Sequence, residues 1–274
     1  MKTIDLHSLS FKSMYIRLMF NDMQLASGTA FLSGLDDGRY MLFTNKHNVT
    51  GKYIGKEGAE ALLDPETGAI PNKLVLRTQL IVETDGEGFG SKGYVEHVLP
   101  LYEDMDAFLD PLWTEHDDPE VDVVGLMYTP KDIDISRLIL SCKEDWFECG
   151  IGEQVNVIGY PFGVSTDSFP VWATGYIASE PSINVDDKPL FYIDSRTRKG
   201  QSGSPVVHRI KVGDVVSYQG QQYAAKKEQY HMLGIYSGRI NEESDIGKVW
   251  KTVALRDILE KKSKEFEAAR TQNT

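Results

Sequence analysis

Apolar and polar residues alternate over short runs along most of the chain, a pattern typical of half-buried strands. Turn signals such as Asp37-Gly38 and Pro161 separate the runs. The pattern predicts two groups of short antiparallel strands rather than alternating strands and helices. The first group covers 14–20, 25–32, 39–44, 73–83, 94–101 and 122–128, and the second covers 137–142, 154–159, 171–178, 190–194, 204–209 and 230–236.

The segment from Val253 to about Arg270 has a different pattern, with apolar residues at helical spacing and charged residues between them. We expect a helix that packs on the second group of strands. The acidic stretch 100–122 lacks the glycine and the regular ligand alternation of a calcium loop, so we expect a surface loop there.

Composition and charge exclude several classes of function. The formal net charge of -12 argues against binding to a nucleic acid backbone, which needs a concentrated basic face. The N-terminus has no uninterrupted apolar run, so neither a secretory signal nor a membrane span is expected. Two cysteines, Cys142 and Cys149, suit a reducing compartment, and we expect a cytoplasmic protein. A mature chain that has lost its signal would look the same.

The cysteine pair itself is open to three interpretations: packing, a metal site or a redox switch. We expect packing, because the sequence places no further cysteine and no histidine close to the pair. No metal or organic cofactor is therefore predicted.

The strongest chemical signal is the run GQSGSPV at 200–206. A serine hydroxyl is a weak nucleophile that needs a neighbouring base and a site for the oxyanion. The glycines on both sides of Ser202 allow a tight turn that exposes its side chain, and the amides of Gly200 and Ser202 are the expected oxyanion hole. A plain Gly/Ser turn is the alternative. The nucleophile elbow of α/β-hydrolases does not fit, because Ser204 replaces its last glycine.

A base and a carboxylate precede this serine in the order His, Asp, Ser. His47 ends the apolar strand 40–47, and Asp122 opens the apolar run 121–126. Asp122 is expected to accept the Nδ1 proton of His47, so that the other ring nitrogen takes the proton of Ser202. Each residue alone is a weak signal, but the combination on two groups of strands is specific.

These motifs resemble the trypsin-like serine peptidases, and in particular the bacterial HtrA-like and glutamyl-endopeptidase-like branches. The segments SGTAF at 27–31 and TNKH at 44–47 are similar to the strand and loop around the family's histidine. VIGYPFG at 157–163 and TGYI at 174–177 are similar to HtrA-type proteases, and 200–206 is similar to the glutamyl endopeptidases. Asp194 agrees with both branches.

The resemblance implies an all-β fold of two six-stranded, chymotrypsin-like barrels followed by the C-terminal helix. The expected domains are 1–130 with His47 and Asp122, 131–250 with Ser202, and 251–274 for the helix and tail. The expected substrate-binding residues are Thr197, Tyr236, Ser237 and Gly238, with Ser237 near the catalytic aspartate.

The resemblance is incomplete at two positions. Tyr236 stands where glutamyl endopeptidases have a histidine, and Gln201 replaces the aspartate that precedes the nucleophile in the trypsin branch. A neutral amide does not pair with a newly cut N-terminus, so we expect activity without N-terminal processing. Bases at 196, 198, 199 and 239 suggest a preference for acidic P1 residues, with a solvated loop face as the equal alternative.

The expected function is a serine endopeptidase that acts on protein or peptide substrates and does not act on a membrane. Three alternatives stay open: a latent protease that an activating or restraining protein partner controls, a catalytically silent peptide-binding module, and an esterase on the same scaffold. The insertions at 51–69 and 101–121 are lids or partner surfaces on this view.

Overall fold

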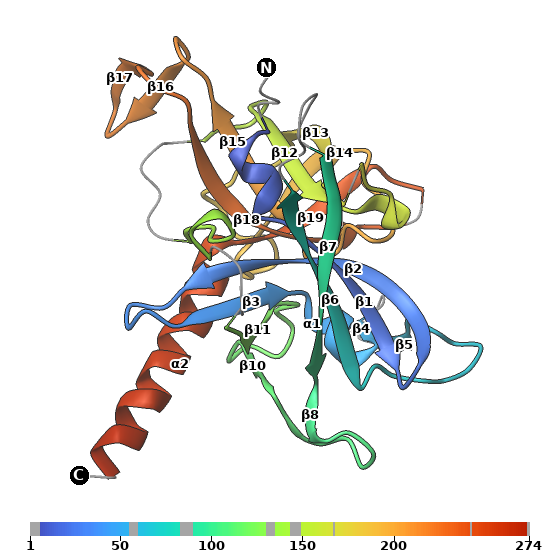
Figure 1. The fold of residues 1–274 in the computed structure, drawn as a ribbon. Coiled ribbons are helices and arrows are strands. Elements are labelled where there is room, and N and C mark those ends of the chain that lie inside the picture. Colours follow the sequence, from blue (N-terminus) through green and yellow to red (C-terminus); the bar gives the residue numbers. More distant parts are fainter. Residues whose placement is uncertain are drawn as a thin grey trace.

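The computed structural model describes residues 6–54, 60–82, 90–129, 135–142, 149–166, 168–241 and 243–272. Figure 1 shows two main β-sheets, one from each half of the chain, and a long C-terminal helix that begins at their junction and extends past the N-terminal sheet. The predicted fold class is confirmed, because the described residues are mostly β with a C-terminal helix. One of the two expected six-stranded barrels closes, whereas the N-terminal half forms a seven-stranded sheet.

The N-terminal sheet has seven antiparallel strands in the order β10-β11-β3-β2-β1-β6-β7. Alternation explains its core: Met14, Ile16 and Leu18 of β1 are fully buried, whereas Tyr15 and Arg17 between them are half-buried. The strands are β1 (Met14–Phe20), β2 (Met23–Gly34), β3 (Tyr40–Thr44), β6 (Lys73–Val82), β7 (Gly90–Pro100), β10 (Trp113–Glu115) and β11 (Val124–Met127).

The C-terminal sheet closes into a barrel in the order β12-β13-β14-β19-β18-β15. Its interior contains apolar side chains from every strand, including Val157, Ile193 and Val249. The strands are β12 (Gln154–Gly159), β13 (Val171–Ile177), β14 (Leu190–Ser195), β15 (Pro205–Ile210), β18 (Gln229–Arg239) and β19 (Ile246–Lys251). A separate hairpin of β16 (Val215–Tyr218) and β17 (Gln221–Ala224) extends from the barrel.

The helix α2 (Thr252–Gln272) follows the barrel directly, as the spacing of its apolar residues predicts. The expectation that it packs on the second barrel is confirmed, and the helix also packs on the N-terminal sheet. Leu255 and Ile258 lie in one buried cluster with Phe31 and Met41 of the N-terminal sheet as well as with residues of the barrel. The helix therefore covers the junction of the two sheets.

The sequence pattern is misleading in two places. The predicted strand 137–142 is a 3-10 turn, Ile135–Arg137, followed by a single parallel bridge between Ile139 and Leu32. The acidic stretch is not simply a loop, because it forms the hairpin β8 (Tyr102–Asp104) and β9 (Leu109–Pro111) and then β10, with Leu101 fully buried beside it.

The insertion at 51–69 contains a second short hairpin, β4 (Lys52–Ile54) and β5 (Glu60–Leu62), with 55–59 outside the described residues.

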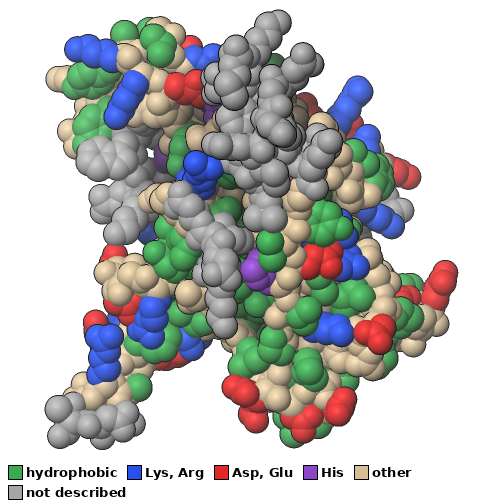
Figure 2. Space-filling model, in the orientation of Figure 1, with side chains coloured by type: hydrophobic (Ala, Val, Ile, Leu, Met, Phe, Trp, Pro, Cys, Tyr) green, Lys and Arg blue, Asp and Glu red, His purple; other side chains and the backbone are tan. Residues whose placement is uncertain are grey.

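On the face in Figure 2, acidic side chains gather at the end of the molecule over β8 and β9. Among the described residues, no helix is long and apolar enough to cross a membrane.

Candidate active site

His47 lies in the short helix α1 (Lys46–Thr50), which follows β3 and ends at Gly51. Its Nδ1 is 2.6 Å from Asp122 Oδ2, and its backbone N–H donates to Asp122 Oδ1 at 2.9 Å. Because both carboxylate oxygens hold the same residue, the imidazole is fixed in position and in tautomer, with Nδ1 as the donor. His47 is 7% exposed.

Asp122 is itself held from three directions. Val121 and Val123 on either side of it are buried, and Asn45 Nδ2 donates to its carbonyl at 2.8 Å. Ser237 Oγ donates to Oδ2 at 2.5 Å, across from the C-terminal barrel. Burial of the carboxylate favours a higher pKa, but the charge of His47 and the hydrogen bonds from His47 and Ser237 outweigh it. The pKa of Asp122 is therefore lowered.

Ser202 belongs to the barrel, but its backbone is bound to the N-terminal sheet. Its carbonyl accepts hydrogen bonds from Thr29 N at 2.8 Å and from Asn48 Nδ2 at 3.3 Å. Asn48 follows His47 in α1, so the same helical turn holds the predicted base and contacts Ser202, the predicted nucleophile. No hydrogen bond joins the Ser202 hydroxyl to His47, both of which lie in the described part of the chain.

Two glycines allow the loop around Ser202 to approach its neighbours. Gly200 has φ +94° and Gly203 has φ +89°, in the left-handed region that favours glycine. A Cβ at 203 would lie 1.9 Å from Thr29 O, and one at 200 would lie 2.4 Å from Tyr160 O. A side chain at 203 would push the loop away from the N-terminal sheet, and one at 200 would push it away from the segment that follows β12.

The peptide between Lys199 and Gly200 has a defined orientation. Its carbonyl accepts from Phe162 N at 2.6 Å, and because the peptide is trans, the Gly200 N–H points to the opposite side. Within the described residues, neither the Gly200 amide nor the Ser202 amide donates to a protein acceptor. Two amides near a serine are therefore available to bind a negatively charged oxygen.

Gln201 stabilises this loop by hydrogen bonds to Arg198. Its side chain is fully buried, and its side-chain Oε1 accepts a hydrogen bond from Arg198 N at 2.7 Å. Its backbone N–H donates to Arg198 O at 3.2 Å. The side-chain amide of Gln201 thus holds the loop, at the position where the trypsin branch has an aspartate.

The predicted substrate-binding residues separate into buried and edge positions. Thr197 and Tyr236 are buried, and their hydroxyls bond to each other. Burial raises the pKa of Tyr236 to about 12. Ser237 is half-buried and donates to Asp122, and Gly238, with φ +118°, follows a bulge in the pairing of β18 with β19.

The positive charge near this region is partly paired. Arg198 Nη1 lies 3.3 Å from Asp245 Oδ1, and Arg196 Nε lies 3.8 Å from Asp245 Oδ2, with the Arg196 side chain 87% exposed. One carboxylate therefore faces two of the bases that suggest a preference for acidic substrates.

Sequence reasoning missed the residues that join the two sheets. Thr29 Oγ1 donates to Gly200 O at 2.9 Å, Thr44 Oγ1 donates to Thr29 O at 2.8 Å, and Asn48 Nδ2 donates to Thr44 Oγ1 at 2.9 Å. A usable signal was the presence of polar residues at positions where β2 and β3 are otherwise apolar, since buried polar groups need partners.

Comparisons with known proteins agree with this architecture at the level of the fold. No family model matches the sequence, and no curated protein matches it. A serine endoprotease from Yersinia pestis is similar in structure, with TM-score 0.50 and 13% identity over 94% of this chain and 67% of that one. The active form of the Rv3671c protease from M. tuberculosis gives TM-score 0.48 and 17% identity over 91% and 80%.

At such low identity the likeness concerns the fold alone. The strand order, the closed barrel and the likeness to the Yersinia pestis protein together show that the chain has the trypsin-like, chymotrypsin-type fold.

Proposed function

We propose that the protein is a serine endopeptidase in which Ser202 is the nucleophile, His47 the base and Asp122 the residue that orients it. The observation that carries this proposal is the network around His47. Asp122 holds both its backbone and its ring, and Asn48, the next residue, contacts the carbonyl of Ser202. The likeness in fold to a serine endoprotease from Yersinia pestis gives further support.

In this mechanism, Ser202 Oγ forms a bond to the substrate carbonyl carbon while His47 Nε2 takes the hydroxyl proton. The C–N bond then breaks, and His47 gives its proton to the leaving amine. Water attacks the acyl-enzyme by the same route and releases the second product and the free serine. Asp122 stays ionised throughout, in keeping with its lowered pKa, and stabilises the imidazolium.

The amides of Gly200 and Ser202 would stabilise the oxyanion that forms on the attacked carbonyl. The orientation of the Lys199–Gly200 peptide and the hydrogen bonds of Gln201 within the loop favour a competent oxyanion hole over a collapsed one. This supports constitutive activity over the latent alternative. It also favours a mature enzyme that needs no N-terminal cleavage, and activity that appears only after such cleavage would contradict this view.

The first experiment is labelling of the purified protein by a fluorophosphonate probe, which reacts with activated serines. We expect labelling of the wild type, and loss of labelling in Ser202→Ala and His47→Ala. Hydrolysis of peptides should fall by roughly 10⁴ to 10⁶-fold in both variants. Ser217→Ala and His116→Asn, outside the site, are matched controls and should label as the wild type does.

The remaining outcomes distinguish the alternatives. No labelling under any condition would indicate a peptide-binding module, and labelling only after addition of a cell extract would indicate a latent enzyme with a protein activator. Labelling that persists in Ser202→Ala would overturn the assignment of the nucleophile.

We further propose a protein or peptide substrate and a cytoplasmic location. Neither of the two described cysteines forms a disulfide, as suits a reducing compartment. Preference for acidic P1 residues stays a prediction, and the pairing of Arg196 and Arg198 with Asp245 favours the alternative of a solvated loop face. A peptide library decides, since cleavage mainly after Lys or Arg would exclude the acidic preference.

A further inference from the structure

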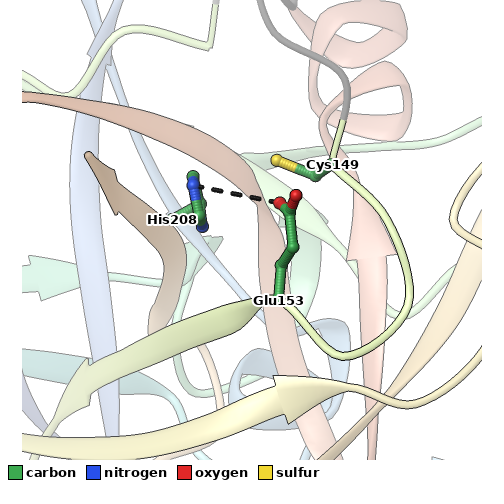
Figure 3. A group of neighbouring side chains, drawn as sticks. All are labelled: Cys149, Glu153 and His208. Carbon is green, nitrogen blue, oxygen red and sulfur yellow. Dashed lines mark ion pairs between the residues drawn. The ribbon is translucent and has the colours of Figure 1, made fainter. Parts of the chain in front are cut away.

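Three side chains that are potential metal ligands meet on the C-terminal barrel, apart from the candidate active site. Cys149 and Glu153 lie in the segment that leads into β12, and His208 lies on β15, so two distant parts of the chain contribute (Figure 3). Their ligand atoms all lie within 4.8 Å of one another, and His208 Nε2 is 3.9 Å from Glu153 Oε2. The sequence alone suggested no such group, because no histidine is near Cys149 along the chain.

The tautomer of His208 places a lone pair on Nε2, the atom that would bind a cation. Nδ1 lies 2.9 Å from the carbonyl oxygen of Gln154. A carbonyl oxygen only accepts hydrogen bonds, so Nδ1 carries the proton and donates it. In the neutral ring Nε2 then has a lone pair directed at the carboxylate of Glu153. Two acceptors that face each other repel unless a proton or a metal ion lies between them. A backbone carbonyl on the far nitrogen is also the usual way in which proteins orient a metal-bound histidine.

A second histidine nitrogen lies near the sulfur, outside this group of three. His231 Nδ1 lies 3.7 Å from Cys149 Sγ, and His231 is the direct partner of His208 in the antiparallel pairing of β15 with β18. In a tetrahedral zinc site, with Zn–S about 2.3 Å and Zn–N about 2.0 Å, neighbouring ligand atoms are roughly 3.3 to 3.6 Å apart. The 3.9 Å between His208 Nε2 and Glu153 Oε2 is roughly half an ångström longer than the separation of two such ligands, so the three side chains would move slightly closer together around an ion.

We propose that Cys149, Glu153 and His208 bind a divalent transition-metal ion of the zinc type. A thiolate and a carboxylate neutralise the two positive charges, and the neutral imidazole of His208 is the third ligand. Sulfur and imidazole ligands favour zinc over magnesium and calcium, which prefer oxygen.

The position of the site indicates what the ion does. Cys149 and Glu153 precede β12, where the chain enters the barrel, and His208 and His231 lie on the neighbouring strands β15 and β18. The ion therefore fastens the entering segment to the barrel wall. His208 also borders a hollow of about 390 Å³ with Gln154, Trp172 and Arg209. None of the predicted catalytic residues lines that hollow.

The test is zinc titration of the reduced protein after chelator treatment, followed by native mass spectrometry. We expect one zinc ion per chain and a rise in melting temperature with zinc, because binding to the folded state alone stabilises it. Cys149→Ser, Glu153→Gln and His208→Ala should each weaken zinc binding at least tenfold. Cys142→Ser and His116→Asn are the matched controls and should keep it.

Cobalt gives a second readout that does not depend on stability. The cobalt-loaded wild type should show the charge-transfer absorption of a cobalt–thiolate bond, and Cys149→Ser should lack it. Absence of a bound ion in the wild type, or unchanged zinc binding in Cys149→Ser, would overturn the proposal and leave a plain His208–Glu153 ion pair. Zinc binding in Ser202→Ala should equal that of the wild type, so failure of the proposed protease function would not affect this result.

Discussion

At the scale of single residues, the carboxylate of Asp122 links the two halves of the candidate site. It accepts hydrogen bonds from the backbone and ring of His47 on one side and from Ser237 of β18 on the other. These groups favour the ionised form, and they outweigh the effect of burial on the pKa of Asp122. The orientation of the base therefore depends on a residue of the opposite sheet.

The substitution Ser237→Ala tests this link. Removing the hydroxyl takes away one donor to the carboxylate, so the pKa of Asp122 should rise toward its usual value. We expect kcat/KM for peptide hydrolysis to fall by about tenfold, as for loss of one hydrogen bond to a charged group. The pH profile of kcat/KM measures both effects. Ser217→Ala is the control, and a variant with unchanged activity and profile would show that Ser237 has no positioning role.

Because Tyr236 is buried against Thr197, we predict that the protein loses stability at alkaline pH. The pKa of Tyr236 is raised from 10.0 to about 12, so the unfolded chain loses its phenol proton first as pH increases. The stability due to this group is complete below pH 10.0 and is lost as the pH rises through about 12.

Tyr236→Phe should therefore be less stable than the wild type near neutral pH, since it leaves Thr197 without this partner, by roughly 1 to 3 kcal/mol. The difference should shrink between pH 10.0 and about 12. Urea unfolding at a series of pH values measures it. A difference that is constant across that range would contradict the assignment.

At the scale of the elements, α2 has a larger role than a cap on one barrel. Its apolar face contacts the cluster that contains Phe31 and Met41 of the first sheet, and Lys261 Nζ donates to Glu115 O at 3.1 Å and to Asp117 Oδ1 at 2.7 Å. The helix thus buries residues of the N-terminal sheet although it follows the C-terminal barrel in the chain.

Leu255→Ala tests the packing of this helix. Leu255 is fully buried, so the variant should lose about 2 to 5 kcal/mol of unfolding free energy through lost burial and the remaining cavity. Lys264→Ala, on the exposed side of α2, is the control and should change stability by no more than about 0.5 kcal/mol. Denaturant unfolding measures both, and equal effects would mean that α2 does not pack as described.

At the scale of the whole molecule, one apolar cluster spans both sheets and the helix. It includes Phe31 and Phe43 from the first sheet, Ile158 and Ile235 from the barrel, and Leu255 from α2. Hydrogen bonds between Thr29 and the loop at Ser202 add to this junction. Each sheet therefore buries part of its apolar surface against the other and against α2.

We therefore expect the protein to unfold in one cooperative thermal transition. Calorimetry should give a single peak, and both Phe31→Ala and Ile235→Ala should shift the whole peak to lower temperature. Two resolved transitions, only one of which moves in each variant, would show that the sheets unfold independently.

The sequence by itself determined the features that have a local signature. Alternation identified β1 and β12 with their ends, helical spacing identified α2, and the run 200–206 drew attention to Ser202. Each is a property of neighbouring residues, because the period of a strand or helix and the turn preference of glycine act over a few positions. The pairing of His47 with Asp122 followed from combining such signals with the resemblance to serine peptidases.

Only the tertiary structure decided what each buried face contacts. It brought Asn48 to Ser202, Leu255 to Phe31, and His208 to Cys149 and Glu153. These contacts join residues that are far apart in the chain, and they arise from strand register and sheet packing. A local pattern indicates that a face is buried but carries no information about the residues that it contacts. For this reason, the link between the sheets and the cluster of potential metal ligands became visible only in the folded chain.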